Sequence, residues 1–374
     1  MRLPDIDTVK IYMFHIRSER NAPIGSWTSR QQIFLKLGAQ GEEGWGECPI
    51  AINNPEVDAI AATKCFETLR GKAVGDAFSM VRSLIGTWPT TFTEAAEMAL
   101  IDLNGKLTNR SAADILALHG KLPVRGVAVS KYKTPEELRR SIQSACQSRK
   151  TSCVRILLTG RPDRDIANIT AVREVAPRGK VYLIGDACER YSSRFFSTTE
   201  QIGIQLLKLY AAGLDACEDP AHLNANAWIT LQSFVSPLTL VADKPLRPAR
   251  RGYIEAHPRM GRLFNIHPDF AGSIFDAVRL AEKLHTNGNR VYIGDDVCIG
   301  PACSAWQQIA IALGADWVEA IEKTKQSDFY QRAKISSGVL YCNGVYNQLQ
   351  NVRGFGTILD ETILSESAAF IIDL

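Results

Sequence analysis

Three acidic side chains follow successive short apolar runs in the middle of the sequence. Asp186 ends "KVYLIGD", Glu218 lies near the end of "LDACED", and Asp243 ends "LTLVAD". Each interval is about the length of one strand–helix unit. If the runs are neighbouring parallel strands, their carboxyl ends bring the three carboxylates to one rim. Each acid alone would be interpreted as an ordinary exposed loop residue.

Three converging carboxylates repel one another unless a cation lies among them. Oxygen ligands with no Cys or His at the matching positions favour Mg²⁺ over zinc. The sequence therefore predicts one Mg²⁺ site formed by Asp186, Glu218 and Asp243.

From about residue 124, short apolar runs alternate with amphipathic stretches. Eight runs are interpreted as strands: "VRGVAVS", "CVRILLTG", "KVYLIGD", "LDACED", "LTLVAD", "RLFNIH", "RVYIGD" and "DWVEAI". Helical stretches such as "TPEELRRSIQSACQS" and "SIFDAVRLAEKLHT" lie between several of them. The pattern predicts an α/β fold, a (β/α)8 TIM-type barrel over residues 124–344. The weakest intervals are "LNANAWITLQSF" and "PLRPARRGYIEAH", which are poor helices.

Residues 1–123 have a different pattern and predict a smaller α+β domain. "TVKIYMFHIR" and "RQQIFLKLGAQ" alternate like strands. "TFTEAAEMALIDLNGKLTN" has the wide apolar face of a packed helix. The last segment, about residues 345–374, is expected to return to this domain.

Composition excludes several classes of partner. The 43 basic and 40 acidic residues give a net charge of +3, too balanced to suggest nucleic acid or a membrane surface. Nine widely spaced cysteines without a CxxC motif argue against a disulfide framework or structural zinc. No signal peptide or membrane span is visible, so we expect a reducing, cytoplasmic setting.

The order of several motifs resembles the enolase superfamily, in the mandelate racemase and muconate lactonizing enzyme branch. The motifs are "GWGECP" (44–49), "AAEMALIDLNGKLTNRSAADIL" (95–116), the three strand-end acids, and "GFGTILDE" (354–361). The resemblance implies that residues 1–123 are a capping domain and that the enzyme removes the proton α to a carboxylate. It also implies a Mg²⁺-stabilised enediolate, a small carboxylate substrate and a homo-oligomer. Residues 20–29 and 51–56 would be specificity loops, or ordinary solvent loops.

Many relatives carry a Lys-x-Lys pair on the second barrel strand. Counting back from Gly160, those positions hold Ile156 and Leu158, which cannot transfer a proton. Strand alternation predicts that both face the barrel interior and that Arg155 faces the other way.

His267, in "FNIHPDF", stands where relatives with two opposed lysines carry one of them. A histidine there is competent as a base near neutral pH, although a structural histidine fits equally well. Asp295, which ends "YIGD", could orient the imidazole.

Two further groups are candidates for the catalytic site. Lys244 directly follows Asp243 and could pair with Glu218 or Asp219, line the site, or form an outward salt bridge. Glu319 ends the eighth strand and could orient a catalytic partner or the substrate. Glu322 is the alternative if the strand register differs.

Two hypotheses follow for the function. The first is a Mg²⁺-dependent lyase or isomerase with a non-standard base, in which dehydration or cycloisomerisation is favoured over racemisation. The second is a non-catalytic protein that keeps the fold and the metal and ligand site but has lost turnover.

Overall fold

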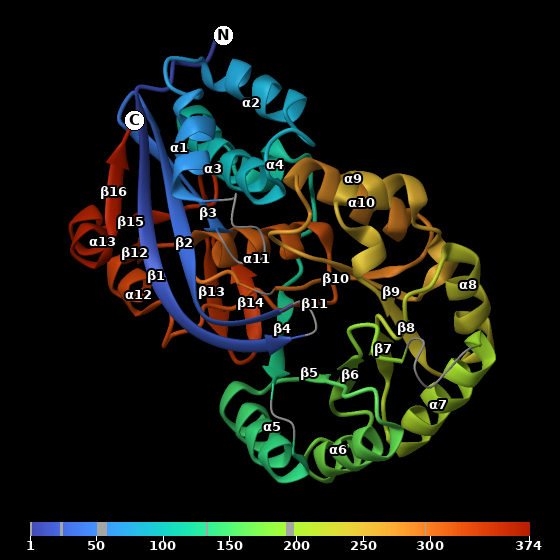
Figure 1. Ribbon diagram of the computed structural model, residues 1–374. Coiled ribbons are helices and arrows are strands. Elements are labelled where there is room, and N and C mark those ends of the chain that lie inside the picture. The colour runs from blue at the N-terminus through green and yellow to red at the C-terminus, as the bar shows by residue number, and fades with distance from the viewer. Residues whose placement is uncertain (1, 23–24, 51–57, 132–133, 192–197, 296) are drawn as a thin grey trace.

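The computed structural model describes residues 2–22, 25–50, 58–131, 134–191, 198–295 and 297–374. Figure 1 shows a barrel surrounded by helices, with a second layer of long strands and helices packed against one side. The predicted loop at 51–56 and residues 23–24 lie outside the described residues. The rest of the predicted loop at 20–29 belongs to two paired strands, which end at Ala22 and begin at Gly25.

The barrel consists of eight parallel strands in sequence order, and β11 pairs with β4 to close it. This confirms the predicted (β/α)8 architecture. The strands are β4 (Val124–Ser130), β5 (Cys153–Leu157), β6 (Tyr182–Asp186), β7 (Ala216–Glu218), β8 (Thr239–Ala242), β9 (Leu263–Ile266), β10 (Arg290–Ile293) and β11 (Trp317–Val318).

Helices cover the outside of the barrel (Figure 1). They are α5 (Pro135–Arg149), α6 (Pro162–Val175), α7 (Thr199–Ala212), α8 (Ala225–Phe234), α9 (Ala249–Glu255), α10 (Ile274–Thr286) and α11 (Pro301–Leu313). Both intervals with poor helical sequences contain helices. Asn224 caps α8 through a hydrogen bond to Ala227 N, and α9 begins directly after Pro248. Local capping and packing on the barrel therefore outweigh weak propensity.

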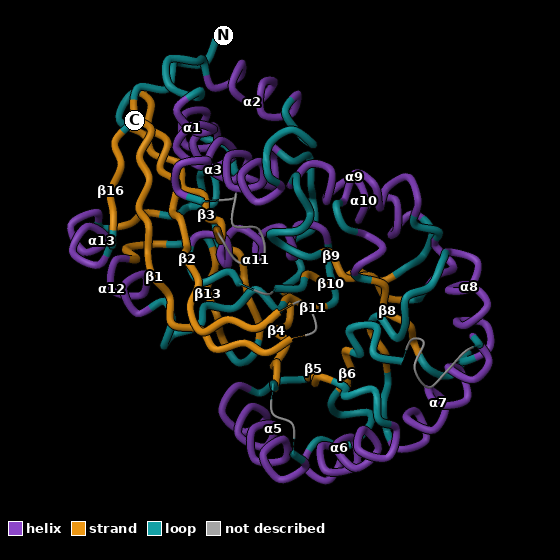
Figure 2. The backbone as a smooth tube through the Cα atoms, viewed as in Figure 1, coloured by secondary structure: helices purple, strands orange, loops and turns teal. Residues whose placement is uncertain are grey.

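The N-terminal domain is an antiparallel sheet with helices on one face. Figure 2 shows its strands side by side in the order β16-β1-β2-β3. Its elements are β1 (Thr8–Ala22), β2 (Gly25–Ala39), β3 (Glu42–Ile50), α1 (Ala59–Glu67), α2 (Val74–Ser83), α3 (Thr90–Thr108) and α4 (Ala112–Ile115).

The C-terminal segment contacts both domains. β13 (Val339–Cys342) and β14 (Val345–Gln348) form a hairpin that pairs with β4 of the barrel. α12 (Asp328–Ala333) precedes β12 (Lys334–Ser336), which pairs with β15 (Ile358–Leu359). α13 (Glu361–Ser367) leads into β16 (Phe370–Asp373), the edge strand beside β1. The domain boundaries stay a prediction.

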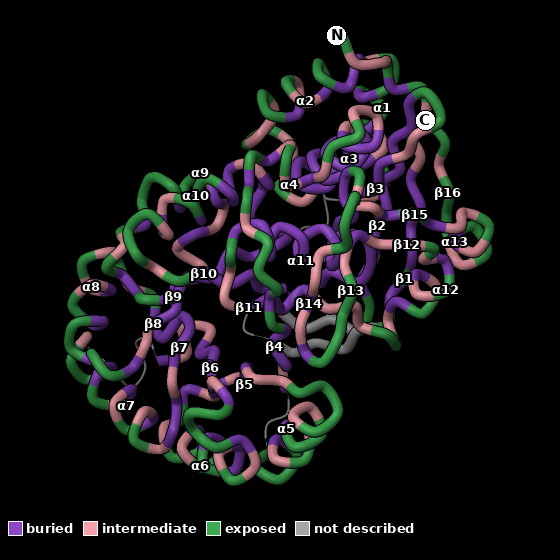
Figure 3. The backbone as a smooth tube through the Cα atoms, turned by 180° about the vertical axis from the view of Figure 1, so that it is seen from behind, coloured by how far each residue is buried: buried purple, intermediate pink, exposed green. Residues whose placement is uncertain are grey.

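The barrel interior begins with an apolar layer to which every strand contributes one side chain. This layer consists of Val127, Cys153, Ile184, Ala216, Val241, Leu263, Tyr292 and Trp317. A separate cluster fills the space between the strands and the surrounding helices. Figure 3 shows the buried backbone along the central strands and α11.

The position of Cys153 corrects the expected orientation of β5. Cys153 belongs to the interior layer, so strand alternation turns Arg155 inward as well. Ile156 and Leu158 lie instead in the outer cluster, against the helices. The prediction was wrong because it counted back from Gly160, whereas the regular strand ends at Leu157.

In the described part of the chain, no helix combines the length and apolarity needed to cross a membrane.

Helix α3 packs directly on β3 because glycines remove the intervening side chains. A Cβ atom on Gly46 would lie 2.1 Å from the backbone oxygen of Ala95, and one on Gly44 would lie 2.1 Å from that of Ala99. Real Cβ atoms do not approach backbone so closely, so this contact depends on both glycines.

We therefore expect Gly46→Ala to lower the free energy of unfolding by at least ~1–3 kcal/mol, the usual cost of overpacking. Gly75→Ala is the matched control, because Gly75 lies within α2 and a Cβ there meets nothing within 4 Å. The control should raise stability by ~0.5–1 kcal/mol. Urea unfolding measures both, and equal midpoints would contradict the proposed close packing.

Candidate active site

A polar ring lies one layer above the apolar layer of the barrel. Moving two residues along each strand from that layer reaches the inward positions nearer the carboxyl ends. On six of the eight strands these positions hold Arg155, Asp186, Glu218, Asp243, Asn265 and Glu319, which are all buried. On β4 and β10 they hold Val129 and Gly294. The three predicted metal ligands therefore project toward the same end of the barrel interior.

Arg155 connects the acids of this ring. Its Nη2 lies 2.8 Å from Asp186 Oδ2 and 2.9 Å from Glu218 Oε1. Its Nε donates to Glu218 Oε2 at 3.1 Å, and its Nη1 lies 3.4 Å from Glu319 Oε1. Burial alone would lower the pKa of the Arg155 guanidinium, but Glu218, Glu319 and Asp186 raise it well above its usual value. Arg155 is thus a permanent cation at the centre of the ring.

Glu218 is the most heavily hydrogen-bonded of the three predicted ligands. Besides the two bonds from Arg155, it accepts one from Asn265 Nδ2 at 3.1 Å and one from the Tyr292 hydroxyl. Sequence reasoning missed Asn265 and Tyr292. Inward alternation from Leu263 would have indicated Asn265.

Asp243 is held by a different arginine. Arg247 Nε donates to Asp243 Oδ1 at 2.6 Å, and Arg247 Nη2 donates to Asp243 Oδ2. Burial raises the pKa of Asp243 to about 7, with Glu218 adding to the rise and Arg247 opposing it. Burial and the charges of Asp243, Glu218 and Asp186 also raise the pKa of Asp219 well above its usual range.

The donor set fits a hard divalent cation in chemistry and in charge. Five carboxylates at the strand ends face two guanidiniums, so negative charge exceeds positive charge: Asp186, Glu218, Asp219, Asp243 and Glu319 against Arg155 and Arg247. Burial is the main reason that the pKa values of Asp219 and Asp243 are raised, and the neighbouring carboxylates raise them further. However, Arg155 already engages Asp186 and Glu218, so a cation would share these two ligands with the guanidinium.

The predicted ligands are not the tightest acidic cluster among the described residues. The group whose ligand atoms all lie within 4.8 Å of one another is Asp269, Asp295 and Cys298. It lies in the loops that follow β9 and β10, close to His267 in the chain.

His267 directly follows β9 and is buried. Its Nδ1 lies 2.9 Å from the carbonyl oxygen of Pro268. A carbonyl oxygen can only accept, so Nδ1 carries the proton and Nε2 is the basic atom of the neutral ring. Gly294 makes room beside it, since a Cβ atom there would lie 2.4 Å from Asn265 Oδ1 and 2.9 Å from His267 Cδ2.

Asp295 is engaged by partners other than those expected. It accepts a hydrogen bond from Cys298 N at 2.8 Å and forms an ion pair with Lys323. Burial lowers the pKa of Lys323, but Asp295 outweighs this and the net shift is upward. The orienting role of Asp295 toward His267 stays a prediction.

The other two candidates have different surroundings. Lys244 Nζ lies 2.5 Å from Glu189 Oε2, and both residues line a pocket of about 570 Å³. Glu319 belongs to the ring through Arg155, whereas Glu322 pairs with Lys334 at 3.2 Å. The geometry therefore favours Glu319 over Glu322 and places the Lys244 ammonium with Glu189.

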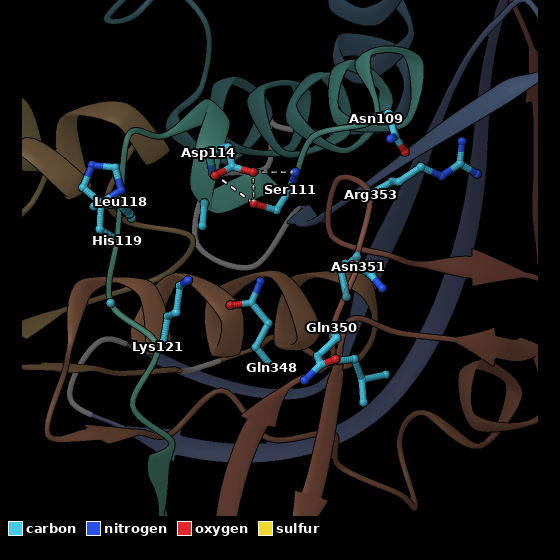
Figure 4. Close-up of a pocket in the computed structure, with 14 residues that line it drawn as sticks. Asn109, Ser111, Asp114, Leu118, His119, Lys121, Gln348, Gln350, Asn351 and Arg353 are labelled. Atoms are coloured by element: carbon cyan, nitrogen blue, oxygen red, sulfur yellow. Dashed lines mark hydrogen bonds between the residues drawn. The ribbon is translucent and has the colours of Figure 1, made fainter.

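A larger groove of about 910 Å³ lies away from all of these residues. Figure 4 shows it between α4 and the segment after β14, lined by polar side chains such as Gln348, Asn351 and Lys121. Lys121 precedes β4, so the groove lies toward the amino end of that strand. The candidate site is at the opposite end.

The comparisons with known proteins agree with this architecture. No model of a known protein family matches the chain. L-Ala-D/L-Glu epimerase from Escherichia coli strain K12 is 22% identical over 283 residues, which cover 75% of this chain and 82% of that protein.

Two solved structures superpose over nearly the whole chain. Muconate lactonizing enzyme from Pseudomonas fluorescens, complexed with muconolactone, gives a TM-score of 0.81 at 16% identity and covers 98% of this chain and 99% of that one. A dipeptide epimerase from Cytophaga hutchinsonii, complexed with Mg and D-Ala-L-Val, gives 0.79 at 15% identity and covers 99% of each chain.

The chain is thus an eight-stranded barrel with a separate antiparallel N-terminal sheet domain. This is the fold of the enolase superfamily, so the resemblance noted in the sequence is confirmed at the level of the fold.

Arg155 should be essential to the stability of the ring. We expect Arg155→Met to lower the free energy of unfolding by ~3–5 kcal/mol at pH 7 without divalent cations, because it leaves buried carboxylates unpaired. Arg250→Met is the control, since Arg250 pairs with Asp276 at the half-exposed edge of α9. The control should cost less than ~1 kcal/mol. Similar losses for the two variants in urea unfolding would contradict the central role of Arg155.

Proposed function

We propose that the chain is a Mg²⁺-dependent enzyme that removes the proton α to the carboxylate of a small-molecule substrate bound at the carboxyl ends of the barrel strands. The observation that carries this proposal is the inward polar ring, with His267 directly after the strand that carries Asn265. The likeness to enolase-superfamily structures supports the same class of chemistry.

Asp186, Glu218 and Asp243 would hold the Mg²⁺ ion. When bound, such an ion stabilises negative charge that develops on substrate carboxylate oxygens. Arg155 adds a fixed positive charge beside Asp186 and Glu218, in a buried setting where electrostatic effects are strong.

His267 would accept the α-proton at Nε2, while its Nδ1–H donates to Pro268 O. The apolar layer fills the barrel interior beneath the ring. Proton transfer in such a site takes place between positioned groups rather than with bulk solvent.

The strand opposite His267 favours one-base chemistry. β5 and β9 lie four positions apart in the eight-stranded ring, and the inward positions of β5 after Cys153 hold Arg155 and Leu157. Leucine cannot transfer a proton, and a guanidinium is too basic to serve readily as a base. We therefore propose elimination or cycloisomerisation rather than the two-base epimerisation that the names of several similar proteins indicate.

A second candidate is a ligand-binding protein without turnover. The contacts of Arg155 with Asp186 and Glu218 favour it, because they satisfy much of the site's charge without a metal. The two functions differ in the need for His267. A homo-oligomeric assembly stays a prediction under both.

His267→Gln tests the base directly. The variant keeps a similar volume but cannot accept the proton, so kcat should fall at least ~10²-fold, the low end for a general base. Mg²⁺ affinity should be unchanged. In D₂O, the parent should not scramble the configuration at the α-carbon, because only one face carries a base.

His285→Gln, on the outer helix α10, is the control and should leave kcat unchanged. Normal turnover by His267→Gln would assign the histidine a structural role, and the absence of turnover in the parent would favour the binding protein.

Asp243→Asn tests the metal site. Loss of one anionic ligand should weaken Mg²⁺ binding in calorimetry by at least ~10-fold. Arg155→Met should have the opposite effect and tighten Mg²⁺ binding, because it removes the competing cation. Asp276→Asn is the control outside the site and should leave the Mg²⁺ affinity unchanged. Equal affinities for Asp243→Asn and the parent would remove Asp243 from the metal site.

A further inference from the structure

Three buried glutamates of the capping domain contact the barrel across the domain interface. Glu47 lies on β3, and Glu94 and Glu97 lie on α3, three residues apart. All three are almost completely inaccessible, with exposures of 1%, 2% and 0%. In the described part of the chain, no Lys or Arg forms an ion pair with them. Their carboxylates instead accept hydrogen bonds from N–H and hydroxyl groups, most of which belong to the barrel.

Glu47 caps helix α11 from the other domain. Gly300, at the N-cap position, has no side chain, and Pro301 occupies the first helical position. Glu47 Oε1 accepts from Ile299 N at 2.8 Å, and Oε2 accepts from Gly300 N and Ala302 N, each at 2.9 Å. The carboxylate thus satisfies donors that the helix cannot satisfy itself.

Glu94 binds the loop that follows β9. Its Oε1 accepts from Asp269 N at 2.9 Å and its Oε2 from Gly272 N at 3.2 Å. His267 is only two residues before Asp269. The Glu94 carboxylate therefore holds the backbone that directly follows the proposed base.

Glu97 continues the same contact at the start of α10. Its Oε1 accepts from the Ser273 hydroxyl at 3.0 Å, and its Oε2 accepts from Ile274 N at 2.6 Å. The two α3 glutamates therefore bind consecutive parts of one loop, from Asp269 to Ile274.

These contacts come at an electrostatic cost. Burial raises the pKa of Glu94 to about 7 and that of Glu97 to about 8, against the lowering effect of their hydrogen bonds. Buried carboxylates without a cation would destabilise the interface unless their hydrogen bonds compensate. Burial also raises the pKa of Glu47, which binds the start of α11, so the cost falls at the loops after both β9 and β10.

We propose that Glu47, Glu94 and Glu97 are positioning residues, through which the capping domain fixes the backbone of the loops after β9 and β10 and so the placement of His267 and Asp295. This inference rests on the proposed function for its catalytic consequence. The positioning itself is a statement about the loops and can be measured without turnover.

Glu94→Gln is the decisive variant. A glutamine oxygen can accept from only one of the two amides, and its NH₂ group then faces the other donor. Amide hydrogen exchange at Asp269 and Gly272 should accelerate about 10-fold. In an active parent, kcat should fall about 10-fold while KM stays within about 2-fold, since the base is displaced and not removed.

Asp102→Asn is the matched control on the same helix. Asp102 is equally buried, accepts from Trp45 N and Phe355 N and pairs with Lys106 at 2.8 Å, and none of its hydrogen bonds among the described residues goes to these loops. It should lower thermal stability without changing exchange at Asp269 and Gly272 or the ratio of kcat to KM. If Glu94→Gln does not fold, Glu97→Gln gives the same test at Ile274.

Unchanged exchange at the loop amides, or equal acceleration in Asp102→Asn, would overturn the inference. Accelerated exchange with unchanged kcat would also overturn it, because the loop would then not control the base. If the parent shows no turnover with any carboxylate, the proposed enzymatic function fails, and the exchange experiment alone decides the positioning role.

Discussion

The contact of Arg155 with Asp186 and Glu218 is the interaction on which the candidate site depends. Parallel strands of a barrel bring their inward side chains together, and here four of the eight positions hold acids. Such a ring is unstable in a buried interior without positive charge. Arg155 supplies that charge from within the chain, and Arg247 does the same for Asp243. A cation bound by these acids would share them with the two guanidiniums.

The sequence indicated the barrel and the strand-end acids because both follow from local patterns. Apolar runs ending in Asp186, Glu218 and Asp243 need no knowledge of tertiary contacts. The side of β5 that faces inward was not predictable from Gly160, since the chain leaves the regular strand after Leu157. A residue of the apolar interior layer, such as Cys153, would have given the correct alternation.

Partners across the barrel were beyond the reach of sequence patterns. Lys323 pairs with Asp295 although 28 positions and a helix separate them, and Lys244 pairs with Glu189 rather than with Glu218 or Asp219. Both ion pairs depend on which loops lie next to one another at the carboxyl end of the barrel. The same applies to Glu47, which lies in the "GWGE" motif but binds amides more than 250 residues away. The motif indicated that Glu47 belongs to the N-terminal domain, but it did not indicate which backbone amides Glu47 binds.

Gly294 restricts which substitutions the candidate site can accept. Its backbone lies so close to Asn265 and His267 that a single methyl group would collide with both side chains. A substitution there would disturb a hydrogen bond to Glu218 and the histidine at once, although the residue itself carries no functional group. A substitution at Gly294 would therefore act on two side chains of the site together, whereas a substitution at His267 would remove only its own.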